Sequence, residues 1–260
     1  MSDWAVVLGA SSGFGGATAR ALAEAGLNIF GVHLDRKATL PMVEAVIGDI
    51  TAAGREALFF NMNAADADKR AEAVAELKAK AGPDGQVKVL LHSLAFGTLK
   101  PAMGHDPADI LAQPQIEMTL DVMASSLVYW TQALYVAGLI RKGSQIFAMT
   151  SSGGHRQFKT YGAVSAAKAA LESYIRQIAV ELSSEGIAAN CIQAGVTDTP
   201  ALRKIPGNEV MIEHALTVNP GGRLTETTDV AAAIALLGLS NNTWLTGNVI
   251  RVDGGEDIGM

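Results

Sequence analysis

The chain has 260 residues, a formal net charge of −6 and 49% hydrophobic residues. Such a length could hold one large α/β domain or two small ones, and the apolar content is enough to bury a sizeable core. There is no long apolar run, and a strand-like pattern starts almost at once, so we expect a cytoplasmic protein without a membrane span or signal peptide. The single cysteine, Cys191, excludes an intrachain disulfide and a cysteine metal cluster, and no basic cluster supports nucleic-acid binding.

Apolar strand-like runs alternate with Ala-rich helical patterns along the whole chain. The runs are hydrophobic rather than strictly alternating, which suits parallel strands covered on both faces. This alternation predicts one domain over residues 1–260, a Rossmann-type, doubly wound parallel sheet of about seven strands with helices on both faces. The predicted strands are 5–8, 29–34, 57–62, 87–92, 145–150, 187–192 and 248–252, and the helical patterns include 15–25, 65–81, 116–137 and 164–184.

Residues 197–219 form the least regular segment, with two prolines and mixed polarity. Ligands of open α/β sheets bind beyond the carboxyl ends of the strands. We therefore expect this segment to be a substrate-binding lid, and a helix–loop insertion is the alternative.

The first strand runs into Gly9-Ala-Ser-Ser-Gly13-Phe-Gly15, and a helical pattern follows. Glycines in such a turn let backbone N–H groups and the helix start approach a pyrophosphate. A turn that serves only packing is the alternative, but its place after the first strand favours a dinucleotide site. The residues expected to contact the cofactor are Gly9, Ser11, Ser12, Gly13, Phe14 and Gly15.

The end of the second strand bears on the choice between NADH and NADPH. An acidic side chain there would bond the ribose 2′-hydroxyl and repel a 2′-phosphate, but the usual position is His33. Arg36 and Lys37 could neutralise a 2′-phosphate, whereas Asp35 argues for the plain ribose. The balance favours NADPH, with His33 and Arg36 as contacts, and NADH stays open.

Four motifs in one chain, Gly9-x3-Gly13-x-Gly15, Ser151, Lys168 and Val252-Asp-Gly-Gly255, resemble the short-chain dehydrogenase/reductase family from about residue 5 to 255. The resemblance implies that Asn63 and Ala64 meet the adenine after the third strand. It also implies that Gly195, Val196 and Thr199 cradle the nicotinamide carboxamide.

Three departures from the common family pattern point to one branch. Residues 91–97 replace the usual Asn-Asn-Ala-Gly motif, and the resemblance implies that Ser93, Leu94 and Ala95 within them contact the cofactor. Met123 replaces a relay asparagine, and Val164 replaces the usual tyrosine four residues before the lysine. Tyrosine instead lies seven residues before it, at Tyr161. This set resembles the enoyl-acyl-carrier-protein reductases, and two stretches, 96–103 and 195–204, resemble their NADPH-dependent type III form.

The displaced tyrosine still makes chemical sense. Seven positions are almost two helical turns, so Tyr161 and Lys168 would share a face. Enoyl reduction places negative charge on the thioester oxygen, which needs a preorganised donor rather than a fast proton relay. We expect Tyr161 to be that donor, Lys168 to bind the ribose hydroxyls, and Ser151 to touch the substrate oxygen. His155 and His214 have no evident partners and are expected to be solvated.

The leading hypothesis is NAD(P)H-dependent reduction of an enoyl thioester, with the acyl group carried on coenzyme A or an acyl carrier protein. A carbonyl reductase or alcohol dehydrogenase is the second hypothesis, and a catalytically idle dinucleotide-binding protein is the third. The family resemblance also implies a homo-oligomer, a dimer or tetramer, formed through two long helices and the last strand.

Overall fold

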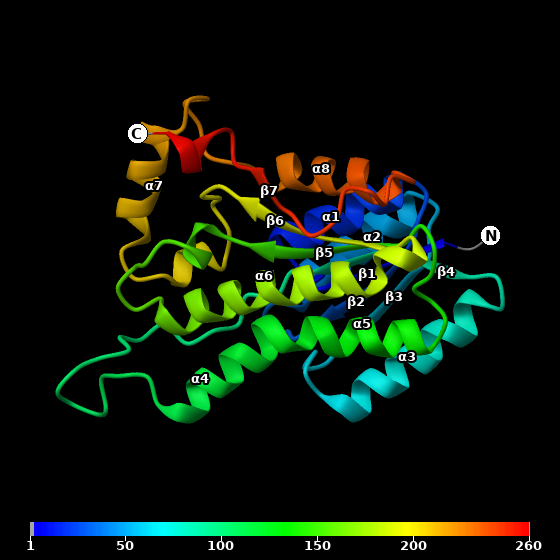
Figure 1. Cartoon of the computed structure of the whole chain (residues 1–260), viewed down its shortest axis with the longest axis horizontal. Coiled ribbons are helices and arrows are strands. Elements are labelled where there is room, and N and C mark those ends of the chain that lie inside the picture. The colour runs from blue at the N-terminus through cyan, green and yellow to red at the C-terminus, as the bar shows by residue number, and fades with distance from the viewer. Residues whose placement is uncertain (1–2, 260) are drawn as a thin grey trace.

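The structure is a computed structural model that describes residues 3–259. Within them, seven strands form one parallel sheet in the order β3-β2-β1-β4-β5-β6-β7 (Figure 1). The order reverses between β1 and β4, which lie side by side in the middle of the sheet. The strands are β1 (Asp3–Leu8), β2 (Asn28–His33), β3 (Ala57–Asn61), β4 (Gln86–His92), β5 (Gln145–Thr150), β6 (Ala188–Ala194) and β7 (Val249–Val252).

Helices cover both faces of the sheet, with α8 and α1 on one side and α3, α5 and α6 on the other (Figure 1). The α-helices are α1 (Gly13–Glu24), α2 (Leu40–Ala52), α3 (Ala67–Ala81), α4 (Gln113–Leu120), α5 (Ser126–Val136), α6 (Gly162–Leu182), α7 (Asn208–Val218) and α8 (Thr227–Leu239). The predicted fold class and strand order along the chain are thereby confirmed.

Strand β1 shows why its residues form a central strand. Successive side chains point to opposite faces of a sheet. Trp4, Val6 and Leu8 therefore enter the core under α3, α5 and α6, while Ala5 and Val7 enter the core under α1, α2 and α8. All five are fully buried. A strand with two buried faces reads as an unbroken apolar run, which is the pattern in the sequence.

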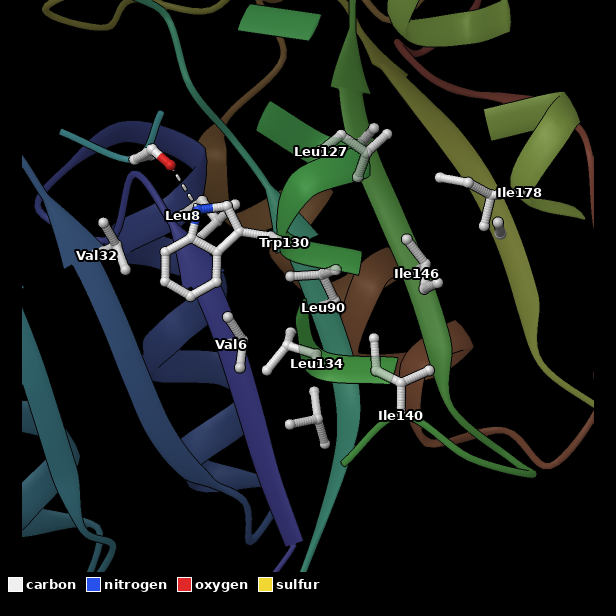
Figure 2. Packing of buried hydrophobic residues seen from close by; sticks show 14 of the residues in the cluster. Val6, Leu8, Val32, Leu90, Leu127, Trp130, Leu134, Ile140, Ile146 and Ile178 are labelled. Carbon is white, nitrogen blue, oxygen red and sulfur yellow. Dashed lines mark hydrogen bonds between the residues drawn. The ribbon is translucent and has the colours of Figure 1, made fainter. Parts of the chain in front are cut away.

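Figure 2 shows the first of these cores, where Val6, Leu90 and Ile146 from three adjacent strands meet Leu127 and Trp130 of α5. The indole Nε1–H of Trp130 donates to the Ala64 carbonyl oxygen at 2.8 Å. This hydrogen bond satisfies the polar atom of the buried ring and holds the segment that follows β3.

The expected helix at 116–137 is interrupted. α4 and α5 are joined by a π-helical turn, Asp121–Ser125, which holds Met123 at its centre. π-Turns of this kind are frequent at functional sites. In residues 197–219 the structure has a short 3₁₀ turn, Leu202–Lys204, followed by α7. None of the helices in residues 3–259 combines the length and the apolar character that crossing a membrane would need.

Candidate active site

The larger of two adjoining cavities opens at the carboxyl ends of β1 and β4, with a volume of about 420 Å³. This is where the strand order reverses, the place at which open α/β sheets bind ligands. Glycines of the β1–α1 turn, the end of β2, the segment after β3 and the end of β4 line it. The predicted cofactor residues that line this cavity are Gly9, Ser11, Ser12, Gly13, Phe14, His33, Asn63, Ala64, Ser93, Leu94, Ala95, Lys168 and Thr199.

The glycines of the β1–α1 turn keep this cavity open and the turn tight. Gly9 has φ +92°, and a Cβ there would lie 2.3 Å from the Ser93 carbonyl oxygen. A Cβ at Gly15 would lie 2.1 Å from the Gly9 carbonyl oxygen, so Gly15 lets α1 pack on the turn rather than lining the cavity. Ser12 caps α1 without a side-chain hydrogen bond, which leaves the N–H groups at the helix start for a phosphate.

Asp35, not Arg36, faces the adenosine end of the cavity. The Asp35 carboxylate lies 3.0 Å from Nδ1 of His33, and Asn61 fixes its backbone through two hydrogen bonds. Burial raises the pKa of this carboxyl, but bonds from Thr39, Ser11 and His33 outweigh burial and hold it below the ordinary value. Arg36 and Lys37 are exposed, and neither lines the cavity.

The second cavity, of about 200 Å³, adjoins the first and is mostly apolar. It extends between the loop after β5, the start of α6 and the segment 194–211, and it includes Gly195 and Val196. Ser151, Tyr161 and Lys168 line both cavities. The structure thus brings the three predicted catalytic side chains together at the junction of the two cavities.

Tyr161 is the N-cap of α6 rather than a residue within it. The preceding Thr160 has φ +66°, a strained conformation for a β-branched residue and one that is typical of functional sites. Burial raises the pKa of the Tyr161 phenol, and the nearby Ser151 hydroxyl offsets part of that rise. The phenol therefore keeps its proton at neutral pH and is a hydrogen-bond donor. The ring of Phe158 packs edge-on against it.

Lys168 is 6% exposed, and its Nζ donates to the Met149 carbonyl oxygen at 2.6 Å. Burial lowers the pKa of its amine to about 8, against the opposing effects of Cys191 and Glu172. At pH 7 the amine is thus mostly protonated. Lys168 is thus buried, as the alanines on either side of it indicated in the sequence.

Ser151 Oγ is buried and makes no hydrogen bond of ordinary geometry within residues 3–259. Its hydroxyl lies beside the Tyr161 ring, because a Cβ on Gly153 would contact both. A buried hydroxyl without a partner costs free energy, and a substrate oxygen between Ser151 and Tyr161 would satisfy it.

The replaced family positions form an apolar wall with one buried imidazole. Val164 and Met123 are buried and line the second cavity. His92, at the end of β4, is fully buried, and its Nε2 lies 2.9 Å from Ser126 Oγ. Burial and then the charge of Lys168 lower the pKa of His92 to about 3, so the imidazole is neutral.

The segment after β7 contributes to the site in a way that the sequence did not indicate. Glu256 lines the second cavity, and both of its carboxylate oxygens accept from the Val196 N–H. Asp257, next to it, pairs with Arg156, Arg251 and His155. His155 is exposed, as expected, and the structure gives it a partner in Asp257. The Asp253-Gly-Gly turn was visible in the sequence, but not the place to which it directs the following acids.

The residues around the first cavity fit a nicotinamide dinucleotide. The glycine turn admits a pyrophosphate, the Asp35 carboxylate can accept from a ribose hydroxyl, and the Lys168 amine reaches the junction of the cavities. In residues 3–259 no three His, Cys, Asp or Glu side chains are placed to hold a metal ion.

The chain is similar to proteins of known name. The enoyl-[acyl-carrier-protein] reductase [NADH] FabI of Nostoc sp. is 31% identical over 174 residues, which are 67% of this chain and 66% of that protein. The (2S)-[(R)-hydroxy(phenyl)methyl]succinyl-CoA dehydrogenase subunit BbsD of Thauera aromatica is 27% identical over 98% of this chain and 96% of its own length. The match to the Nostoc reductase thus spans slightly less than two thirds of that protein.

The fold is shared with the crystal structure of the enoyl-[acyl-carrier-protein] reductase (NADH) of Aquifex aeolicus. The TM-score is 0.84 over 98% of this chain and 96% of that chain, at 21% identity. Residues 9–256 match the protein family described as "Enoyl-(Acyl carrier protein) reductase". The chain therefore belongs to this family of short-chain dehydrogenases/reductases, which are nicotinamide-dependent oxidoreductases.

Proposed function

We propose that the protein reduces the carbon–carbon double bond of an enoyl thioester with a reduced nicotinamide dinucleotide. One observation carries this proposal: a protonated Tyr161 phenol and the Lys168 amine meet at the junction of the two cavities, while position 164 is a buried valine. A phenol that stays protonated at neutral pH can donate to a developing oxyanion, and it cannot act as the base in alcohol oxidation.

The chain's own residues would act on the thioester oxygen. When bound, the dinucleotide would supply a hydride to the β-carbon, negative charge would develop on that oxygen, and a proton from solvent would then add to the α-carbon to give the saturated thioester. The Tyr161 O–H donates to the oxygen, and the protonated Lys168 adds positive potential beside it. One such preorganised donor contributes about 3–4 kcal/mol to the transition state. The apolar wall of Val164 and Met123 keeps the local dielectric low, which strengthens both effects.

The choice between NADH and NADPH depends on the charged residues that follow β2. The preference for NADPH expected from Arg36 is not confirmed, because Arg36 is exposed and does not line the cavity that Asp35 lines. A carboxylate at this place bonds a ribose 2′-hydroxyl and repels a 2′-phosphate. Asp35 therefore favours NADH, the cofactor named for the Nostoc relative. NADPH remains the alternative that the positive charges of Arg36 and Lys37 support.

A direct assay tests the proposal. Purified full-length protein is mixed with crotonyl-coenzyme A or crotonyl-acyl carrier protein and either NADH or NADPH, and absorbance is followed at 340 nm. We expect cofactor oxidation with the formation of butyryl thioester, detected by mass spectrometry. No consumption in all four combinations would overturn the proposal.

Carbonyl reduction is the second candidate, favoured by the buried Ser151 hydroxyl beside Tyr161. Two hydroxyls directed at one oxygen could also stabilise a developing alkoxide. A 3-ketoacyl thioester in the same assay distinguishes the two reactions. Turnover of the ketone that exceeds turnover of the crotonyl thioester at least tenfold would favour this candidate.

We also propose that the protein is a homo-oligomer, and that residues 197–219 act as a lid over the substrate. Support for the first is the exposure of large apolar side chains on α5, α6 and the segment before β7, namely Val136, Val180 and Trp244. Support for the second is that Leu202, Ile205 and Met211 line the second cavity. A monomeric mass by light scattering would contradict the first proposal. Equal proteolysis of 197–219 with and without substrate analogue would contradict the second.

A further inference from the structure

Glu172 lies one helical turn beyond Lys168 on α6 and faces the same strand. Residues four apart on a helix are neighbours, with Cβ atoms about 5–6 Å apart. The Thr150 hydroxyl donates to Glu172 Oε1 at 2.6 Å, and the Lys168 amine donates to the carbonyl oxygen of Met149, the residue before Thr150. Two adjacent residues of β5 are thus held by two adjacent turns of α6.

The loop after β5 is shaped around this carboxylate. A Cβ on Gly154 would lie 2.6 Å from Glu172 Oε1, so a side chain at residue 154 would displace this carboxylate. Ser165, also on α6, donates to the Gly153 carbonyl oxygen and holds the same loop. The position of the Glu172 carboxylate is therefore fixed by β5 and by the loop that carries Ser151 toward Tyr161.

The other titratable groups near Lys168 do not supply a negative charge at neutral pH. From β4, His92 is buried and neutral. From β6, burial raises the pKa of the Cys191 thiol to about 12, which keeps it protonated. Arg176, one turn beyond Glu172, is exposed and acts on Cys191. Cys191 and then Glu172 oppose the effect of burial on the pKa of Lys168, and Glu172 is the carboxylate of the two.

We propose that Glu172 is a positioning residue: held by Thr150, its carboxylate keeps the neighbouring Lys168 amine protonated and anchors the end of β5 when that amine turns to the cofactor. The inference rests on the role proposed for Lys168. A protonated amine is required both to add positive potential to the reacting oxygen and to donate to ribose hydroxyls. Activity should therefore be lost as pH rises through the pKa of Lys168, and Glu172 sets how high that limit lies.

The test compares the wild type with Glu172→Gln, which keeps an acceptor for Thr150 but removes the charge. Glu181→Gln is the matched control, because it removes one negative charge from the same helix at an exposed site, where Gln177 is its side-chain partner within residues 3–259. The Lys168 Nζ titration is followed in the unliganded protein by NMR of ¹³Cε-labelled lysine, with Lys168→Met to assign the signal. The pH profile of kcat/KM is measured in parallel.

We expect Glu172→Gln to lower the Lys168 midpoint by about 1 pH unit and to move the alkaline limb of the activity profile by the same amount. Glu181→Gln should change neither. An unchanged midpoint in Glu172→Gln would overturn the inference. If that variant does not fold, Glu172→Asp, which withdraws the carboxylate by one methylene, should lower the midpoint by a smaller amount, and no change there would equally overturn it.

The titration separates this inference from the proposed function, because it needs neither substrate nor cofactor. A lowered midpoint in a protein without enoyl reductase activity would leave the inference standing and remove the proposed function. Enoyl reduction with an unchanged midpoint would do the reverse.

Discussion

The glycine turn after β1 and the lysine site between β5 and α6 face the same crevice. The glycine turn depends on residues that have no side chain, whereas the lysine site depends on polar side-chain atoms that are buried. Gly9 and Gly15 each leave space that a Cβ would fill against backbone at 2.3 Å or less. At the lysine site, Lys168, His92 and Ser151 Oγ are removed from solvent.

This difference decides how each region tolerates change. A substitution in the glycine turn acts through steric overlap and backbone strain, so it damages folding and binding together. At the lysine site, the free-energy cost of burying polar groups is already present in the folded protein. Removal of such a group should cost activity while leaving or even raising stability, as in other active sites that trade the two.

Tyr161→Phe gives the largest expected separation of activity from stability. The variant keeps the ring that packs on Phe158 and loses only a buried hydroxyl. We expect kcat for the crotonyl thioester to fall about 100- to 1,000-fold, the effect of removing one oxyanion donor, with a melting temperature at or slightly above that of the wild type. Tyr135→Phe, whose hydroxyl bonds Glu185 far from both cavities, is the control. A kcat within threefold of the wild type would show that Tyr161 only packs.

Gly9→Ala should have the next largest effect, and on stability. Its Cβ would overlap the Ser93 carbonyl oxygen, and its φ of +92° is disfavoured for alanine. We expect a loss of about 3 kcal/mol in the free energy of unfolding by urea. Gly54→Ala has a similar positive φ but open space around it, so it should cost only about 1 kcal/mol. Equal losses in the two variants would mean that strain alone, rather than close approach, makes Gly9 necessary.

The same contrast explains which features could be predicted from the sequence. The glycine turn and the seven strands were predictable because each leaves a local mark: glycines at fixed spacing, and apolar runs where both faces of a strand are buried. The spacing predicted that Tyr161 and Lys168 lie together, as they do in the cavity lining, and the alanines around Lys168 predicted its burial. The strand bounds differ from the prediction by no more than two residues at either end.

Features that depend on long-range packing left no such mark. In the sequence, Glu172 resembles an ordinary solvated helix residue. Its role depends on the packing of α6 against β5, because its hydrogen bond to Thr150 spans 22 positions. The cavity wall formed by Glu256 depends on how the chain turns after β7. Asp35 was seen, but its direction relative to Arg36 is fixed by Asn61 on the neighbouring strand, which the pattern could not supply.

Lys168→Met tests whether the lysine site costs stability. The folded-state pKa of about 8, against an ordinary 10.5, corresponds to ~3 kcal/mol at neutral pH, and the lost bond to Met149 offsets part of it. We expect the inactive variant to be more stable than the wild type by about 2 kcal/mol at pH 7. Below pH 8 the Lys168 amine is protonated in both the folded and the unfolded state, so the full free-energy cost of burying its charge is present. Between pH 8 and 10.5 only the unfolded state is protonated at Lys168, so the stability of the wild type should rise relative to that of the variant.

Urea unfolding of both proteins at pH 7 and pH 9.5 measures this gap. A gap that narrows with pH would confirm that the buried charge is its cause. A variant that is less stable than the wild type at pH 7 would show that the Lys168 contacts outweigh the burial of its charge, and the two regions would then not differ as argued.

Asp35→Asn has the smallest expected effect. It tests the end of the crevice where a partly buried carboxylate lies close to the glycine turn. Removing the charge should weaken the repulsion of a 2′-phosphate while keeping a side-chain acceptor for His33 and both backbone hydrogen bonds to Asn61. We expect kcat/KM for NADPH relative to NADH to rise about tenfold, or about 1.4 kcal/mol. Arg36→Ala is the matched test of the opposite charge. If Asp35→Asn leaves the ratio unchanged and Arg36→Ala lowers it tenfold, the exposed arginine selects the cofactor, and NADPH is the cofactor that this site prefers.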